Sequence, residues 1–99
     1  MITFKEIKYF IAVSEELNFR KAARKLNISQ PPLSQQIKIL EEKIGFKLFD
    51  RNRGFVRLTL AGKKFLKDSY DISLKIKRSI IYGKKIDVGE IGTLRIGFS

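Results

Sequence analysis

The chain has 99 residues, enough for one modest hydrophobic core, and a formal net charge of +11 from 21 Lys and Arg against 10 Asp and Glu. Its hydrophobic content of 43% is typical of a folded domain and too high for a disordered basic tail. The lack of His and Cys excludes zinc fingers, disulfide scaffolds and catalytic centres built on these residues. No apolar run reaches the roughly 20 residues of a membrane span, and no signal-peptide pattern opens the chain. We therefore expect a basic cytoplasmic protein with an anionic partner, nucleic acid being the first candidate.

Caps and apolar spacing predict the first two helices. Thr3 and Glu6 have the spacing of a capping box, at the start of a helix that we expect to run from Phe4 to Glu16. Asn18 is a good N-cap for a short second helix, whose paired alanines would let another helix approach closely. A tight turn at Asn27 then leads to a third helix.

Two prolines mark the start of the third helix. Pro31 and Pro32 are tolerated only in a first helical turn, and Gly45 is a natural stop. The inward stripe consists of Leu33, Ile37, Leu40 and Ile44. The opposite face consists of Pro31, Ser34, Gln35 and Lys38. This outward face is small and hydrogen-bonding at its start and cationic further on, which favours contact with a partner.

A hairpin and a long helix are predicted next. Residues 46–58 hold two apolar-leaning segments around a polar tip, which predicts a β-hairpin whose tip carries Arg51 and Arg53. Thr59 would cap a fourth helix, from Leu60 to about Lys85. Because three helices would already complete the core, the apolar stripe of this helix needs a partner, most simply a second copy of the chain. The predicted dimer interface consists of Phe65, Ile72, Ile76 and Ile80.

The last residues change character. Glycines appear, and Leu94, Ile96 and Phe98 alternate with other residues, which predicts a linker and a first β-strand. Because a strand without a sheet is not stable alone, we expect the chain to be the N-terminal part of a longer protein. The predicted organisation is a domain over residues 1–58, a linker helix over 59–88, and a hinge with the first strand of a truncated domain over 89–99.

Charge and periodicity together predict a DNA-binding helix-turn-helix. Between Asn18 and Lys38 the chain has five cations and no acid, whereas a purely solvated surface would mix the signs. Small residues at the start of the third helix would let its backbone approach the major groove, where Gln35 could pair with adenine. Arg51 and Arg53 suit a wing that reaches the backbone or minor groove. The basic patch supplies further candidates in Arg20, Lys21 and Lys38.

At these residues the sequence resembles the DNA-binding end of LysR-type transcriptional regulators. The matching stretches are Phe10–Glu15, Asn18–Ala23, Leu26–Ser34, Leu40–Gly45, Leu48–Arg51 and Leu58–Gly62. The resemblance implies a mainly α, winged helix-turn-helix fold of three helices and a small β-hairpin wing, followed by a long dimerisation helix. It also implies a C-terminal domain that binds a small-molecule effector, a dimer on an interrupted inverted repeat of double-stranded DNA, and a higher oligomer at full length.

The family's contacts to bases and phosphates map onto eight positions. They are Ser29, Gln30, Pro31, Pro32, Ser34, Gln35, Arg51 and Arg53. Gln35 departs from the family, which very often has arginine there, so its preference is expected to lean toward adenine or a weaker contact.

Three other classes of function fit the sequence less well. A non-specific architectural or RNA-binding domain would bind by charge alone, without a preferred sequence. An enzyme is not expected, because no catalytic constellation can be placed, and neither a metal nor a cofactor is expected in this part of the protein. An interaction module built on the long helix would leave the basic patch unexplained.

Overall fold

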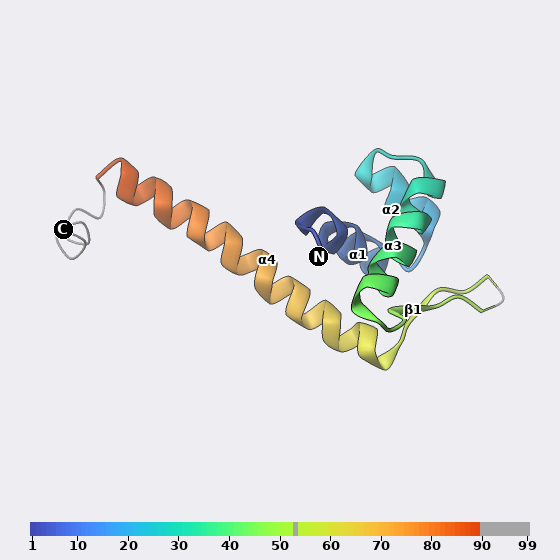
Figure 1. Ribbon diagram of the computed structural model, residues 1–99. Helices are drawn as coiled ribbons and strands as arrows, with labels where there is room; N and C mark the ends of the chain where they lie inside the picture. The colour runs from blue at the N-terminus through green and yellow to red at the C-terminus, as the bar shows by residue number, and fades with distance from the viewer. Residues whose placement is uncertain (53, 90–99) are drawn as a thin grey trace. The chain divides into compact units, whose positions relative to one another are not determined.

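The computed structural model describes residues 1–52 and 54–89 and is mainly helical (Figure 1). Its elements are α1 (Phe4–Glu16), α2 (Phe19–Leu26), α3 (Gln30–Ile44), β1 (Phe49–Asp50), β2 (Arg57–Leu58) and α4 (Leu60–Asp87). The predicted fold class is confirmed, with the hairpin pairing Phe49 with Leu58 in antiparallel register. Arg53 and the strand predicted beyond Gly89 lie outside the described residues. No helix in the described ranges is both long and apolar enough to cross a membrane.

The chain divides into two units, Met1–Ser69 and Tyr70–Ser99, so that α4 begins in the first and continues in the second. The first unit holds the three short helices, the hairpin and the opening turns of α4. Any surface formed by α2, α3 and the hairpin therefore lies within the first unit.

The predicted caps form as hydrogen bonds. The hydroxyl of Thr3 accepts from the amide of Glu6 at 3.2 Å, and the Glu6 carboxylate accepts from the amide of Thr3 at 2.7 Å. The Asn18 side chain accepts from the amide of Lys21 at 2.9 Å, at the start of α2. Helix α3 ends at Gly45, whose φ of +85° lies in the left-handed region that favours glycine.

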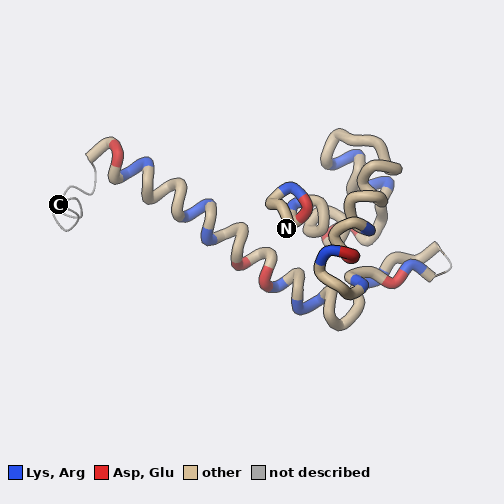
Figure 2. The backbone as a smooth tube through the Cα atoms, viewed as in Figure 1, with Lys and Arg blue, Asp and Glu red and all other residues tan. Residues whose placement is uncertain are grey.

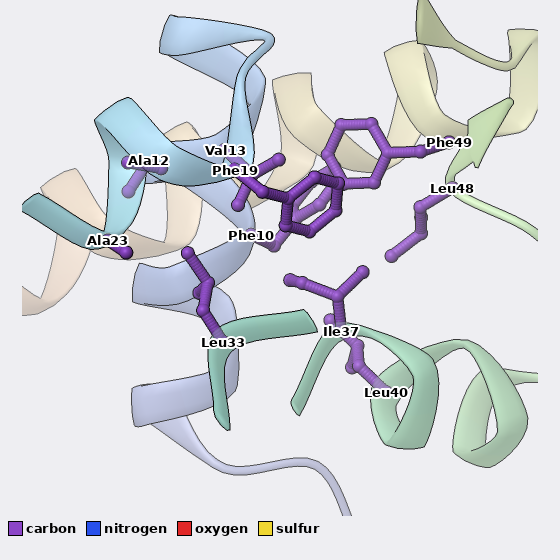
Figure 3. Packing of buried hydrophobic residues seen from close by; sticks show 11 residues of the cluster. Phe10, Ala12, Val13, Phe19, Ala23, Leu33, Ile37, Leu40, Leu48 and Phe49 are labelled. Carbon is purple, nitrogen blue, oxygen red and sulfur yellow. The ribbon is translucent and has the colours of Figure 1, made fainter. Parts of the chain in front are cut away.

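The core lies where α1, α2 and α3 meet the hairpin (Figure 3). Its largest fully buried apolar side chains are Phe10, Val13, Leu33, Ile37, Leu40 and Leu48. Phe10 also contacts the ring of Phe65 at the start of α4, with a centroid distance of 5.3 Å. The expectation that three helices complete the core alone is therefore wrong. Phe65 is half-buried in its own chain, against Phe10 and Phe46, because the first turns of α4 cover the core.

The backbone of Leu48 connects α3, the hairpin and α4. Its amide donates to a carboxylate oxygen of Glu41 at 2.7 Å, and its carbonyl accepts from the amide of Thr59 at 3.0 Å. The Thr59 hydroxyl accepts from the amide of Gly62 at 2.9 Å and thereby caps α4, as the sequence predicts. We call these four residues the Leu48 junction.

Gly62 is required for the Leu48 junction to close. A Cβ at this position would overlap the carbonyl oxygen of Leu48. Alanine is the better helix former by about 1 kcal/mol, but overpacking against backbone costs roughly 1–3 kcal/mol. We expect Gly62→Ala to lower the free energy of unfolding, measured by urea denaturation. Gly83→Ala is the control, because a Cβ there meets nothing within 4 Å, and it should stabilise the same helix. Equal stability of the two variants would contradict this packing.

The free energy of unfolding is expected to depend on pH through the Glu6 carboxylate. Burial raises the pKa of Glu6, but hydrogen bonds from Lys43 and Thr3 outweigh burial, and the pKa lies below its ordinary value of 4.5. The Lys43 ammonium lies 2.9 Å from this carboxylate. A depressed pKa in the folded state means that the stabilisation is present above about pH 4.5 and is lost as the pH falls through the folded-state pKa.

Thermal denaturation between pH 7 and pH 3 checks this expectation. Glu6→Gln should be less stable than the wild type at neutral pH. Its melting temperature should also fall less between pH 7 and pH 3, which gives a flatter acid limb of the stability curve. Glu42→Gln, at an exposed position of α3, should keep the wild-type limb. An acid limb that is the same in all three proteins would show that Glu6 does not contribute.

Candidate nucleic-acid interface

The outward face of α3 presents polar groups to solvent. Gln35 and Lys38 are exposed and Ser34 is half-buried, as their spacing predicts. Pro31 and Pro32 occupy the first turn of α3 and are exposed. The first turns therefore combine short side chains with free hydrogen-bonding groups, which allows close approach of a partner.

The start of α3 lies beside the start of α2 and the hairpin. These three elements and the end of α1 surround an open cavity of about 320 Å³. Its lining residues are Leu17, Asn18, Phe19, Arg20, Gln30, Gly54 and Val56. The structure thus brings the predicted contacts Arg20 and Gln30 together with the hairpin, a juxtaposition that sequence spacing could not give.

Lys and Arg recur along the chain in this region (Figure 2). Arg20, Lys21 and Arg24 of α2 are exposed. Lys25 is different, because its ammonium lies 2.9 Å from Glu15, and this hydrogen bond is the largest cause that raises the pKa of Lys25. One of the five cations between residues 18 and 38 is therefore already paired with an acid of the chain itself.

Arg51 lies in the connection between the two strands, but its side chain is folded back onto the domain. The residue follows β1 directly, whereas the tip turn closes further on, where the amide of Phe55 donates to the carbonyl of Asn52 at 2.9 Å. The guanidinium carbon of Arg51 lies 4.4 Å from the ring centroid of Phe19, and its Nη2 lies 4.0 Å from Glu41. With 28% of its side chain exposed, Arg51 is folded against the domain because these two groups attract its charge.

Sequence reasoning missed two residues of this region. Lys38 and Arg51 line a second open cavity, of about 380 Å³, together with Lys47 and the buried acid Glu41. Lys47 lies in the segment before β1, and sequence spacing does not predict its place beside Lys38 of α3, which depends on the return of the hairpin. Glu41 is the second missed residue, because its burial accompanies hydrogen bonds from the amides of Leu48 and Phe49 that the sequence pattern does not reveal.

The predicted dimer residues on the second unit are exposed in the single chain. Ile72 is 50% exposed, Ile76 is 37% exposed and Ile80 is 54% exposed. Other large apolar residues of α4 are exposed as well, namely Tyr70, Leu74, Ile81 and Tyr82. These residues widen the exposed apolar surface of the helix around Ile72, Ile76 and Ile80.

The chemistry of the first unit is that of a binding surface. Across residues 1–52 and 54–89, no group of three or more acidic side chains is placed to hold a metal ion. The carboxamides of Asn18 and Gln30 and the cation Arg20 line one open cavity. The cations Lys38, Lys47 and Arg51 line the other, together with the acids Glu41 and Asp50. Carboxamides can match base edges, and cations can match phosphates.

Helices α2 and α3, joined by a tight turn and followed by a two-stranded hairpin, define a winged helix-turn-helix domain. Residues 4–63 match the sequence profile described as "Bacterial regulatory helix-turn-helix protein, lysR family". The chain belongs to this LysR family.

Several relatives align over nearly the whole chain. This chain is 49% identical over 98 residues to the "Uncharacterized HTH-type transcriptional regulator YnfL" of Escherichia coli (strain K12). It is 50% identical over 94 residues to the HTH-type transcriptional regulator AlsR of Bacillus subtilis (strain 168). These alignments cover 99% and 95% of this chain but 33% and 31% of the relatives, so the chain spans about a third of their length.

Solved structures of similar domains include DNA complexes. The chain is similar to the BenM_DBD/catB site 1 DNA complex, with a TM-score of 0.87 and 37% identity over 90% of this chain and 96% of that one. It is also similar to the CbnR_DBD-DNA complex, with a TM-score of 0.83 and 37% identity over 87% of this chain and 99% of that one.

Proposed function

We propose that this chain is the sequence-specific, double-stranded DNA-binding part of a dimeric, cytoplasmic bacterial transcription regulator. Helix α3 would enter the major groove, and the hairpin would contact the backbone or the minor groove as a wing. The observation that carries the proposal is the shared cavity, where the polar start of α3, the basic start of α2 and the hairpin lie together. Two of the similar solved structures are complexes of DNA-binding domains with DNA, which supports the proposal.

Base recognition would come from the start of α3. An α-helix fits the major groove, and its first turns carry side chains to the base edges. The exposed Gln35 carboxamide can donate and accept at once, which matches the N6 and N7 atoms of adenine. Pro31 and Pro32 are compact, so the helix can come close enough for that contact.

Phosphate contacts would fix the orientation of the domain. Arg20, Lys21 and Lys38 are exposed around the start and the outward face of α3, and Ser29 makes no capping hydrogen bond with its side chain. Cations that neutralise phosphates release counterions, so binding should weaken steeply as salt rises.

Dimerisation through α4 would set the spacing of two half-sites. The exposed Ile72, Ile76 and Ile80 form the apolar stripe that supports this contact. The relatives are about three times longer than this chain. We propose that a further domain of the full-length protein binds a small-molecule effector and that the full-length protein forms a higher oligomer.

Selection of bound duplexes from a random DNA pool, at near-physiological salt, tests this function. We expect enrichment of an inverted repeat with a fixed gap. Enrichment of a single half-site would retain specificity and contradict dimeric binding. No enrichment, with binding that vanishes as salt rises, would instead support a non-specific architectural or RNA-binding domain.

Replacing Gln35 tests the base contact. We expect Gln35→Ala to change the preference at one base pair per half-site by roughly 1–3 kcal/mol, because one specific contact is lost. Competition binding with single-base variants of the selected site measures this change. Gln36→Ala removes the same chemistry from a neighbouring half-buried position off the outward face and should leave the preferences in place. Unaltered preferences in Gln35→Ala would refute the assignment.

A further inference from the structure

Glu41 is a buried acid in a strongly basic chain. It belongs to α3 and is 5% exposed. One of its oxygens, Oε2, accepts from the amides of Leu48 and Phe49, at 2.7 and 3.2 Å. A single carboxylate of α3 thus holds the backbone where the chain enters the hairpin.

The other oxygen of Glu41 faces Arg51. The Arg51 Nη2 lies 4.0 Å from Oε1, and the guanidinium lies over the ring of Phe19 in α2. Within the described ranges this Nη2 is buried and has no hydrogen-bond partner, so the nearby carboxylate is the group that offsets its burial. We call Glu41, Arg51 and the Phe19 ring the Glu41 clamp.

The hairpin needs such a connection to have a fixed direction. Each of its strands has two residues, and a two-stranded hairpin is marginally stable by itself. The Glu41 clamp connects the end of β1 to α3 through the carboxylate and to α2 through the ring. Both helices of the helix-turn-helix therefore hold the same arginine of the hairpin.

We propose that Glu41 is a positioning residue that sets the direction of the wing relative to α3 and thereby determines the wing's contacts with DNA. Arg51 acts with Glu41 as part of the clamp. This inference rests on the proposed function, because it concerns how the DNA contacts of the hairpin are arranged.

Neutralising Glu41 tests the proposal, because the proposal and simple charge removal predict opposite changes in DNA affinity. Glu41→Gln keeps an oxygen for the two amides but turns its NH₂ toward the guanidinium, donor against donor. Removing a negative charge should by itself strengthen DNA binding. We expect the opposite, a loss of roughly tenfold in affinity, because the wing would no longer be held in its binding direction. Glu42→Gln makes the same charge change at an exposed neighbour and should bind as tightly as the wild type or more tightly.

Hydroxyl-radical footprinting on the selected duplex separates positioning from general support of the fold. In Glu41→Gln the protection made by the wing should be lost, while the base preference at the Gln35 position is retained. A full footprint with the affinity of Glu42→Gln would overturn the proposal. Equal loss of wing protection and base preference in a folded variant would overturn it too.

Arg51→Met carries the test if Glu41→Gln does not fold. Methionine keeps apolar packing on Phe19 and leaves the Glu41 bonds to the two amides intact. The same loss of wing protection with retained base preference is expected, and a complete wing footprint would overturn the proposal. Failure of the proposed function is recognised separately, because the wild-type chain would then select no sequence.

Discussion

The backbone of one buried residue, Leu48, holds the parts of this domain in register. Its amide is bound by the Glu41 carboxylate of α3, and its carbonyl is bound by Thr59 at the start of α4. The absence of a side chain at Gly62 lets α4 approach this carbonyl. The amide and the carbonyl of a buried residue must both be hydrogen-bonded. These contacts therefore fix the backbone between the end of α3 and the hairpin.

The functional surface follows from this constraint. With the hairpin fixed beside α2 and α3, Arg20 and Gln30 share a cavity with Gly54, and Lys38 shares another with Lys47. Charge and hydrogen-bonding groups then occupy one region of the first unit, although they come from separate elements. Three acids of the first unit are paired with cations of the chain: Glu6 binds Lys43, Glu15 binds Lys25, and Glu41 faces Arg51.

Local signals predicted most of the fold. Capping residues, prolines and apolar periodicity are encoded within a few positions, so the three short helices, the stop at Gly45 and the capped start of α4 could be predicted. The packing of Phe65, the packing of the Arg51 side chain and the burial of Glu41 could not, since each depends on contacts between distant segments. For the site, the outward face of α3 was predictable from helical spacing, whereas its neighbours across the cavities required the return of the hairpin.

The central claim is that α3 and the wing together bind one DNA sequence in preference to others. Amide chemical-shift mapping of the isotopically labelled chain, with a duplex carrying the selected repeat and with a scrambled duplex at equal salt, tests it most directly. The account predicts that the selected duplex shifts the amides of residues 29–38 and of the hairpin most strongly, and that the scrambled duplex does so much less. Equal, diffuse shifts with both duplexes, spread over the basic residues of α2 and α4, would contradict it.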